Sequence, residues 1–241
     1  GKWTQTDANP PVTFSDNTKF NAVVTGLVSG NIYKFQWTIT ASASCPSNSN
    51  VVTITVDTPP VGGIAAANPA EICFGSSTQV NLTGQLGSVV QWETSIDNSN
   101  WSPISNITTT LVTPVLTQKT YYRALIHNGS TCTDVYSAVA IVTVDTPPTA
   151  AIAGPPDEVC TTAAYTLQGN TPTSGTGKWT QIDAFPPVTF SDNTLPNATV
   201  TGMLAGNTYQ FKWTITASTF CPPSSATVTN KIDKPPVGSI A

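Results

Sequence analysis

Five cysteines are the residues of this chain whose type and spacing could do chemistry. Cys73 and Cys132 lie roughly 60 residues apart, and Cys160 and Cys221 repeat that spacing. The first member of each pair ends the same local phrase, Glu-Ile-Cys or Glu-Val-Cys. We therefore predict two disulfides, Cys73–Cys132 and Cys160–Cys221. The fifth, Cys45, occupies the position of Cys221 in a repeated stretch, so we expect its partner upstream of the given sequence.

The predicted disulfides have a metal site as their alternative, and the spacing disfavours it. Zinc sites need closely spaced ligands such as C-x-x-C or a Cys/His cluster, and the sequence has neither. Calcium could use the Asp-Asn pairs at Asp16, Asp97 and Asp192, but no D-x-D-x-D spacing occurs, and Asp-Asn is common turn chemistry. We expect no metal and no cofactor.

Catalytic and sugar-binding residues are sparse. His127 is the single histidine, it lies in the loop phrase His-Asn-Gly-Ser-Thr-Cys, and no G-x-S-x-G phrase accompanies it. The few acidic residues fall mostly in turns or linkers, so a glycosidase pair is disfavoured. We expect no catalytic residues and no enzyme. Trp101 and Tyr121 could stack on sugars, which keeps a carbohydrate-binding face open as an alternative.

The elements that position the cysteines are predicted to be strands. Charged residues make up only 9% of the chain, while Thr and Val favour strands and 20 Pro and 16 Gly residues punctuate turns. No window places apolar residues at helical spacing over three turns. The fold class is therefore all-β. The net charge of −4 without a basic cluster argues against nucleic acid, and the longest apolar runs are too short to cross a bilayer.

A repeat sets the domain organisation. Residues 1–65 recur as 177–241 with roughly two-thirds of the positions identical. Val-Asp-Thr-Pro-Pro or its variant Ile-Asp-Lys-Pro-Pro begins at Val56, Val144 and Ile232. The spacing of about 88 residues approaches the ~100 residues of an immunoglobulin-like sandwich. We predict the later part of a type A module at 1–58, a type B module at 59–146, a type A module at 147–234 and the start of the next type B module at 235–241. The sequence is then an internal part of a longer array.

Aromatic residues supply the predicted cores. Two repeated strands alternate Tyr-x-Phe-x-Trp, and a period of two places all three rings on one face. Trp92 is the candidate of the middle module, where a hairpin is expected near Asp97-Asn98. The core aromatics are expected to be Tyr33, Phe35, Trp37, Trp92, Trp179, Tyr209, Phe211 and Trp213.

These phrases resemble a known group of repeats. The type A phrases Trp-Thr-Gln, Thr-Phe-Ser-Asp-Asn-Thr and Gly-Asn-x-Tyr-x-Phe-x-Trp-Thr-Ile-Thr look like PKD-like domains of very large surface proteins of Bacteroidota. The type B phrases Ile-Cys-Phe-Gly, Gln-Trp-Glu-Thr-Ser and Thr-Tyr-Tyr-Arg-Ala resemble the Ig-like domains that accompany them. The resemblance covers essentially the whole chain. It implies tandem β-sandwiches in a type IX-secreted cell-surface adhesin of the gliding-motility SprB type. The third module departs from the first at Asn230-Lys231, where the first has Ile54-Thr55. This polar pair suggests a more exposed edge strand.

We therefore expect an extended structural stalk or fibre segment outside the bacterial cell that projects an adhesive tip and bears load through disulfide-braced sandwiches. Each bond would carry tension across its module, although simple bracing of a secreted domain is an alternative. The expected partners are neighbouring repeats of the same chain, with surface polysaccharide or other cells as further candidates, and without membrane contact. Alternative functions are a carbohydrate-binding array, spacer repeats of a secreted enzyme, or a self-assembling surface filament.

Overall fold

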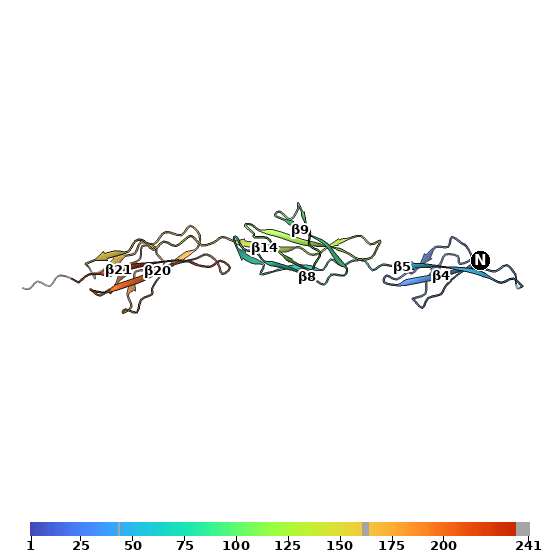
Figure 1. Ribbon diagram of the computed structural model, residues 1–241, viewed down its shortest axis with the longest axis horizontal. Coiled ribbons are helices and arrows are strands. Elements are labelled where there is room, and N and C mark those ends of the chain that lie inside the picture. Colours follow the sequence, from blue (N-terminus) through green and yellow to red (C-terminus); the bar gives the residue numbers. More distant parts are fainter. Residues whose placement is uncertain (43, 161–163, 235–241) are drawn as a thin grey trace, which may run out of the picture. The chain divides into compact units, whose positions relative to one another are not determined.

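Strands are the regular elements of the structure. The computed structural model describes residues 1–42, 44–160 and 164–234, and every regular element in these ranges is a β-strand (Figure 1). The predicted class, all-β with tandem sandwich domains, is confirmed. No described segment forms a helix long and apolar enough to cross a membrane. Two compact units are present: unit 1 contains Gly1–Ala67, Gln79–Val112 and Tyr121–Ile141, and unit 2 contains Asn68–Thr78, Thr113–Thr120 and the chain from Val142 onward.

The first part of unit 1 is a three-stranded antiparallel sheet in the order β1-β4-β5, accompanied by the hairpin β2-β3. The alternation in β4 places Tyr33 and Phe35 in the interior, and Phe14 of β2 packs edge-on against Phe35 at 5.6 Å. Trp37 was expected in the core, but its ring, which packs against Trp3 with the centroids 5.1 Å apart, stays partly exposed. The strands are β1 (Lys2–Gln5), β2 (Thr13–Phe14), β3 (Val24–Thr25), β4 (Ile32–Ile39) and β5 (Asn48–Thr55).

The second part of unit 1 contains the buried Trp92 on β9. Its indole Nε1 donates to the Thr108 carbonyl at 2.9 Å, and its side chain has no exposed surface. The predicted hairpin is present: β9 and β10 pair in antiparallel fashion, and Asn98 between them takes a positive φ of 60°. β12 pairs with β9 and β13, and β11 with β8. The strands are β6 (Ile64–Asn68), β8 (Gln79–Thr83), β9 (Ser88–Ser95), β10 (Ser102–Ile104), β11 (Thr110–Val112), β12 (Thr120–His127) and β13 (Val135–Tyr136).

Unit 2 contains a β-sandwich. A four-stranded sheet, β15-β21-β20-β17, and a three-stranded sheet, β16-β19-β18, enclose a core that includes Trp179, Tyr209, Phe211 and Trp213, all without exposed surface. Unit 2 also holds the parallel pair of β7 with the end of β14. The strands are β7 (Glu71–Cys73), β14 (Ala140–Asp145), β15 (Asp157–Val159), β16 (Tyr165–Thr166), β17 (Thr176–Gln181), β18 (Thr189–Phe190), β19 (Thr199–Thr201), β20 (Thr208–Thr216) and β21 (Ser224–Ile232).

The polar pair Asn230-Lys231 does not mark an edge strand. β21 lies between β15 and β20, and the Asn230 side chain is fully buried, where its Oδ1 accepts the Asp157 amide at 3.2 Å. The hydrogen bond to β15 satisfies the side-chain oxygen of Asn230, while its buried Nδ2 has no hydrogen-bond partner. The module limits 1–58, 59–146 and 147–234 remain a prediction, and 235–241 lies outside the described residues.

Candidate functional site

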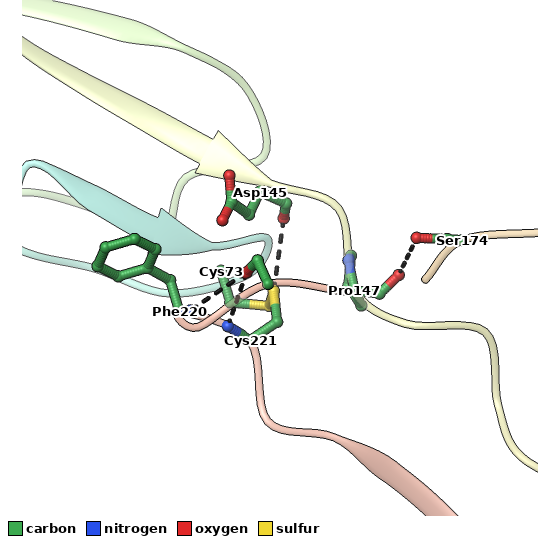
Figure 2. The surroundings of a disulfide bond; sticks show 7 residues. Cys73, Asp145, Pro147, Ser174, Phe220 and Cys221 are labelled. Atoms are coloured by element: carbon green, nitrogen blue, oxygen red, sulfur yellow. Dashed lines mark hydrogen bonds between the residues drawn. A yellow bond between two sulfur atoms is a disulfide. The ribbon is translucent and has the colours of Figure 1, made fainter. Parts of the chain in front are cut away.

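One disulfide is formed among the described cysteines, and it joins Cys73 to Cys221 (Figure 2). The two Cα atoms are 4.8 Å apart, within the range of unforced bridges, and 148 residues separate them in sequence. The predicted pairs Cys73–Cys132 and Cys160–Cys221 are therefore wrong in this structure. Cys45, Cys132 and Cys160 carry free thiols.

Cys73 is held by a short parallel strand pair. β7 runs beside the end of β14, so that Cys73 lies opposite Asp145, and the Phe74 amide donates to the Asp145 carbonyl at 2.9 Å. Ile72 is buried next to it and fixes the strand by its apolar side chain. The phrase Glu-Ile-Cys therefore places a thiol where the chain leaves β14 for the Pro-Pro linker.

Cys221 approaches the same point from the loop between β20 and β21. The Ser218 hydroxyl accepts the amides of Phe220 and Cys221, both at 3.2 Å, which fixes the turn that presents the sulfur. The Cys221 Sγ lies 3.7 Å from the Asp145 carbonyl oxygen. Figure 2 shows Asp145, Cys73 and Cys221 converging there. With only 8% and 4% of their surfaces exposed, Cys73 and Cys221 form a shielded bond.

The peptide linker beside this bond is itself ordered by hydrogen bonds. Pro147 lacks an amide hydrogen, but its carbonyl accepts the Ser174 hydroxyl at 2.9 Å, and the Thr149 amide donates to the Ser174 carbonyl at 3.0 Å. The chain thus passes from β14 into the sandwich by two covalent routes, the peptide bonds of Asp145–Thr149 and the bridge from Cys73 to Cys221. This pair of routes is called the Asp145 junction below.

Strand direction explains why the predicted pair Cys160–Cys221 is not formed. Cys160 follows β15, whose Val159 pairs with Ile232 at the end of β21, whereas Cys221 precedes the start of β21 at Ser224. A strand of 9 residues spans nearly 30 Å at about 3.3 Å per residue, far beyond the ~7 Å limit between bridged Cα atoms. Cys132, the predicted partner of Cys73, belongs to unit 1, whereas Cys73 belongs to unit 2.

Once the Glu-x-Cys strand is known to lie beside the Pro-Pro step, the order of segments in the sequence argues against Cys160–Cys221. The last strand of each repeat runs toward its Pro-Pro step, and the loop cysteine comes before that strand. The loop cysteine must then lie at the far end of the strand from a Glu-x-Cys thiol that sits beside the step. The equal spacing of the cysteines led to the wrong pairs, because spacing carries no information on strand direction.

A second junction, at Asp57, is built by hydrogen bonds. The Asp57 carboxylate accepts the amides of Ser130 at 2.6 Å and Thr131 at 3.3 Å, and the Asn128 amide group donates to the Thr58 carbonyl at 2.7 Å. Hydrogen bonds from the Ser130 amide and hydroxyl lower the pKa of Asp57, because they outweigh the opposite effect of burial. Gly129 has a φ of 79°, and a Cβ there would overlap the Asp57 side chain. The loop that ends at Cys132 is therefore fixed on the linker.

The other candidate residues have structural partners. His127 Nδ1 lies 2.6 Å from an Asp134 oxygen, and both side chains are exposed. Thr18 and Thr194 donate amide and hydroxyl hydrogens to Asp16 and Asp192, as Asx turns do, and Asp97 caps its own hairpin in the same way. In the described part of the chain, no three His, Cys, Asp or Glu residues are grouped as metal ligands.

Trp101, a candidate for sugar stacking, has one face covered. The Arg123 guanidinium lies 4.0 Å from the Trp101 ring centroid and 3.7 Å from that of Tyr136. Glu93 fixes this arrangement, because its carboxylate accepts from Arg123 at 2.7 Å and from the Tyr136 hydroxyl at 3.1 Å. The cluster stabilises the sheet of β9 and β12. Tyr121, the other candidate, is partly exposed on β12.

The fold and the bridge define a disulfide-linked protein of tandem β-sandwich domains. A family model described as a domain of unknown function (DUF8696) matches residues 61–146. No curated protein matches the chain in sequence.

Several solved structures are similar to this chain at low sequence identity. Extracellular domains 3–5 of Drosophila OTK are 10% identical, with 86% of this chain and 72% of that one covered and a TM-score of 0.43. Murine CEACAM1b is 10% identical (71% and 98% covered, TM-score 0.39). Fibronectin(III)-like modules of Clostridium thermocellum CbhA are 13% identical (72% and 91% covered, TM-score 0.32). These likenesses concern the fold alone.

Proposed function

We propose that this chain is a structural segment of an extracellular fibre that transmits tension between neighbouring β-sandwiches. The observation that carries the proposal is the Asp145 junction, in which the Cys73–Cys221 bridge runs beside the peptide linker. A single peptide linker would suffice to string domains together. A second covalent route at the same point is useful where the connection must resist force.

The disulfide also supports an extracellular location for the chain. Stable disulfides persist in oxidising surroundings and are rare in the cytosol of most organisms. The low charge content and the Thr-rich, Pro-rich composition agree with an exported structural chain. On the sequence resemblance stated above, the fibre is a shaft region of a Bacteroidota cell-surface adhesin that carries its adhesive tip elsewhere. The chain has no catalytic role in this proposal.

The bridge sets the path of the force. Tension entering from the N-terminal side reaches Cys73, crosses to Cys221 and leaves along β21 toward Asp233. The residues between the two cysteines form a closed covalent loop that carries no tension even if it unfolds. With a sequence separation of 148, that loop hides roughly 500 Å of contour length, at about 3.4 Å per residue. Overstretching would therefore extend only the segments outside the two cysteines, which include β21, while the loop between the cysteines would add no length.

Single-molecule force spectroscopy on the full chain, held at its two ends, tests the proposal. The oxidised chain should reach a final contour length about 500 Å shorter than the chain kept in reductant. Cys221→Ser should behave as the reduced chain does even when oxidised. Cys45→Ser is the matched control, because Cys45 is an exposed free thiol in the repeat-equivalent position, and it should leave the oxidised length unchanged. Equal lengths with and without reductant would refute the proposal.

A further inference from the structure

At the Asp145 junction, a cysteine from the sequence before the Pro-Pro step meets a cysteine from the sequence after it. The Asp145 backbone ends the last strand before a Pro-Pro step and contacts two partners. One is the parallel strand ending in Cys73, and the other is the Cys221 loop, which belongs to the sequence after the step. The recurrence of Val-Asp-Thr-Pro-Pro suggests that other junctions assemble by the same rule.

Cys160 occupies the place of Cys73 at the next Pro-Pro step. β15 runs parallel to the end of β21, as β7 does to β14, with Val159 opposite Ile232. The Asp233 amide donates to the Val159 carbonyl at 2.9 Å, so Cys160 follows directly beside the aspartate of Ile-Asp-Lys-Pro-Pro. Its thiol is exposed and unbonded. The strand half of a junction is therefore formed there.

Cys132 lies in a loop that contacts Asp57, and it therefore corresponds to Cys221 at the Asp145 junction. Asp57 is the repeat counterpart of Asp233, and the amides of Ser130 and Thr131 bind the Asp57 carboxylate. The next residue is Cys132, whose thiol is free. The Cys160 strand thus contacts Asp233 from the module before that step, and the Cys132 loop contacts the equivalent Asp57 from the module after its step.

Cys45 is the repeat counterpart of Cys221, which is bonded in this chain. Both cysteines follow the Thr-Ile-Thr end of an aromatic strand and precede the last strand of their repeat. The bond that Cys221 makes to Cys73 identifies the chemistry that fits Cys45. By analogy with the Cys73–Cys221 bond, the thiol of a Glu-Ile-Cys strand from a copy of the middle module would fit Cys45.

We propose that Cys45, Cys132 and Cys160 are half-sites of junction disulfides, so that every Pro-Pro step in an array of these repeats is bridged. Cys45 and Cys132 each bond to the Glu-x-Cys thiol of the preceding module, and Cys160 bonds to the loop thiol of the following one. Each bridge forms by exchange with the disulfide of an oxidised dithiol oxidoreductase. The two module thiols lose two electrons and two protons, and the oxidoreductase disulfide is reduced to two thiols.

This inference rests on the proposed function and extends its force path. At each module, tension would enter through a linker and a loop cysteine and leave through a Glu-x-Cys thiol and the next linker. In residues 147–234 the routes from Pro147 to Cys160 and from Cys221 to Asp233 are both short. The body of the sandwich between Cys160 and Cys221 would carry no tension.

The test is a longer chain in which a copy of residues 59–176 precedes Gly1, which completes a B-A-B-A array. The copy carries Ile72→Val and Val159→Ile to mark its peptides by mass. After air oxidation with an oxidised dithiol oxidoreductase, non-reducing peptide mapping should find the copy's Cys73 bonded to Cys45 and its Cys160 bonded to Cys132. The Cys73–Cys221 bond should persist beside them.

The outcomes separate the two proposals. Cys132→Ser, made in the original residues and not in the added copy, should remove only the bond to the marked Cys160. Cys45→Ser should remove only the bond to the marked Cys73. If Cys45 and Cys132 stay free while Cys73–Cys221 forms, this inference is wrong and the proposed function stands. Bonds within one module, such as Cys73–Cys132 or Cys160–Cys221, would overturn both.

Discussion

Residues 1–58 and 177–234 are identical at roughly two-thirds of their positions and share the same local geometry, yet they differ in burial. The ring centroids of Trp3 and Trp37 lie 5.1 Å apart, and those of their counterparts Trp179 and Trp213 also lie 5.1 Å apart. Trp213 is completely buried, whereas Trp37 is partly exposed. Every residue of β5 is exposed, but its counterpart β21 buries Val228, Asn230 and Ile232.

The segment that precedes the repeat accounts for this difference. In unit 2, β15 pairs with β21 and β16 pairs with β19, while Leu167 and Tyr165 enter the core. The Leu167 amide donates to the Ala198 carbonyl at 3.0 Å. Residues 1–58 have no counterpart of this segment within the given chain. Strand pairing and ring stacking are therefore local properties of the repeat, whereas burial requires residues 147–176.

An apolar hollow marks the position that the segment would fill. Trp3, Phe14 and Phe35 line it together with Val24 and Val52, and its volume is about 130 Å³. In unit 2 the counterparts of these residues pack in or against the core that contains Leu167. The hollow is thus the open half of a sandwich core.

The largest expected change in burial comes from adding the segment that would complete the sandwich core of residues 1–58. A chain with a copy of residues 147–176 placed ahead of Gly1 should bury Trp3 and Trp37 and shield β5. Each large apolar side chain that becomes buried contributes roughly 1.5–3 kcal/mol. Amide exchange in β5, followed by mass spectrometry, should slow by about 100-fold or more.

A matched variant controls for chain length. The same added segment with Leu167→Asp introduces a charge into the core and should restore fast exchange in β5, since a buried unpaired carboxylate is strongly disfavoured. Unchanged exchange with the native segment would mean that the exposure of β5 has another cause. The comparison between the two copies would then fail.

Much of this structure could be predicted from the sequence, and the failures share one physical cause. The aromatic alternation predicted the buried faces of β4 and β20, and the turn residues predicted the β9–β10 hairpin, because both depend on neighbours along the chain. Trp37 and the cysteine pairs depend on segments that are far away in sequence. Whether Trp37 is covered, and which end of a strand meets which loop, follows from strand order and direction, which residue spacing alone does not encode.

A smaller effect is expected from deleting one ring in each copy. Trp213→Ala should destabilise the sandwich of unit 2 by about 3–5 kcal/mol, the usual cost of removing a fully buried aromatic side chain. Trp37→Ala should cost less than about 2 kcal/mol, because that ring already faces solvent in part. Urea titration with exchange read separately in β20 and β4 measures both. Trp213→Phe, which keeps an aromatic ring, is the control for loss of packing volume. Equal costs at the two sites would contradict the difference in burial.

The smallest difference should appear at the aspartates that fix the loop after the first strand of each copy. Burial acts to raise the pKa of Asp7, but hydrogen bonds from the Lys34 amide, the Gln5 side chain and the Asn9 amide outweigh it and lower the pKa to about 2. Asp183 has the equivalent donors, led by the Gln210 amide at 2.7 Å, and its pKa is lowered for the same reasons. The two loops thus make the same bonds although their sheets differ in burial.

A lowered pKa fixes the sign of the pH dependence. Each carboxylate stabilises the folded state fully above its unfolded pKa of about 3.9, and that contribution is lost as the pH falls through the folded value. For Asp7 the loss should occur between about pH 4 and pH 2. Asp7→Asn and Asp183→Asn should each flatten the acid dependence of exchange in the adjoining strand, β4 or β20, and to a similar extent. A clearly larger effect at Asp183 would show that burial of the sheet strengthens the loop, and the loop would then not be a local property of the repeat.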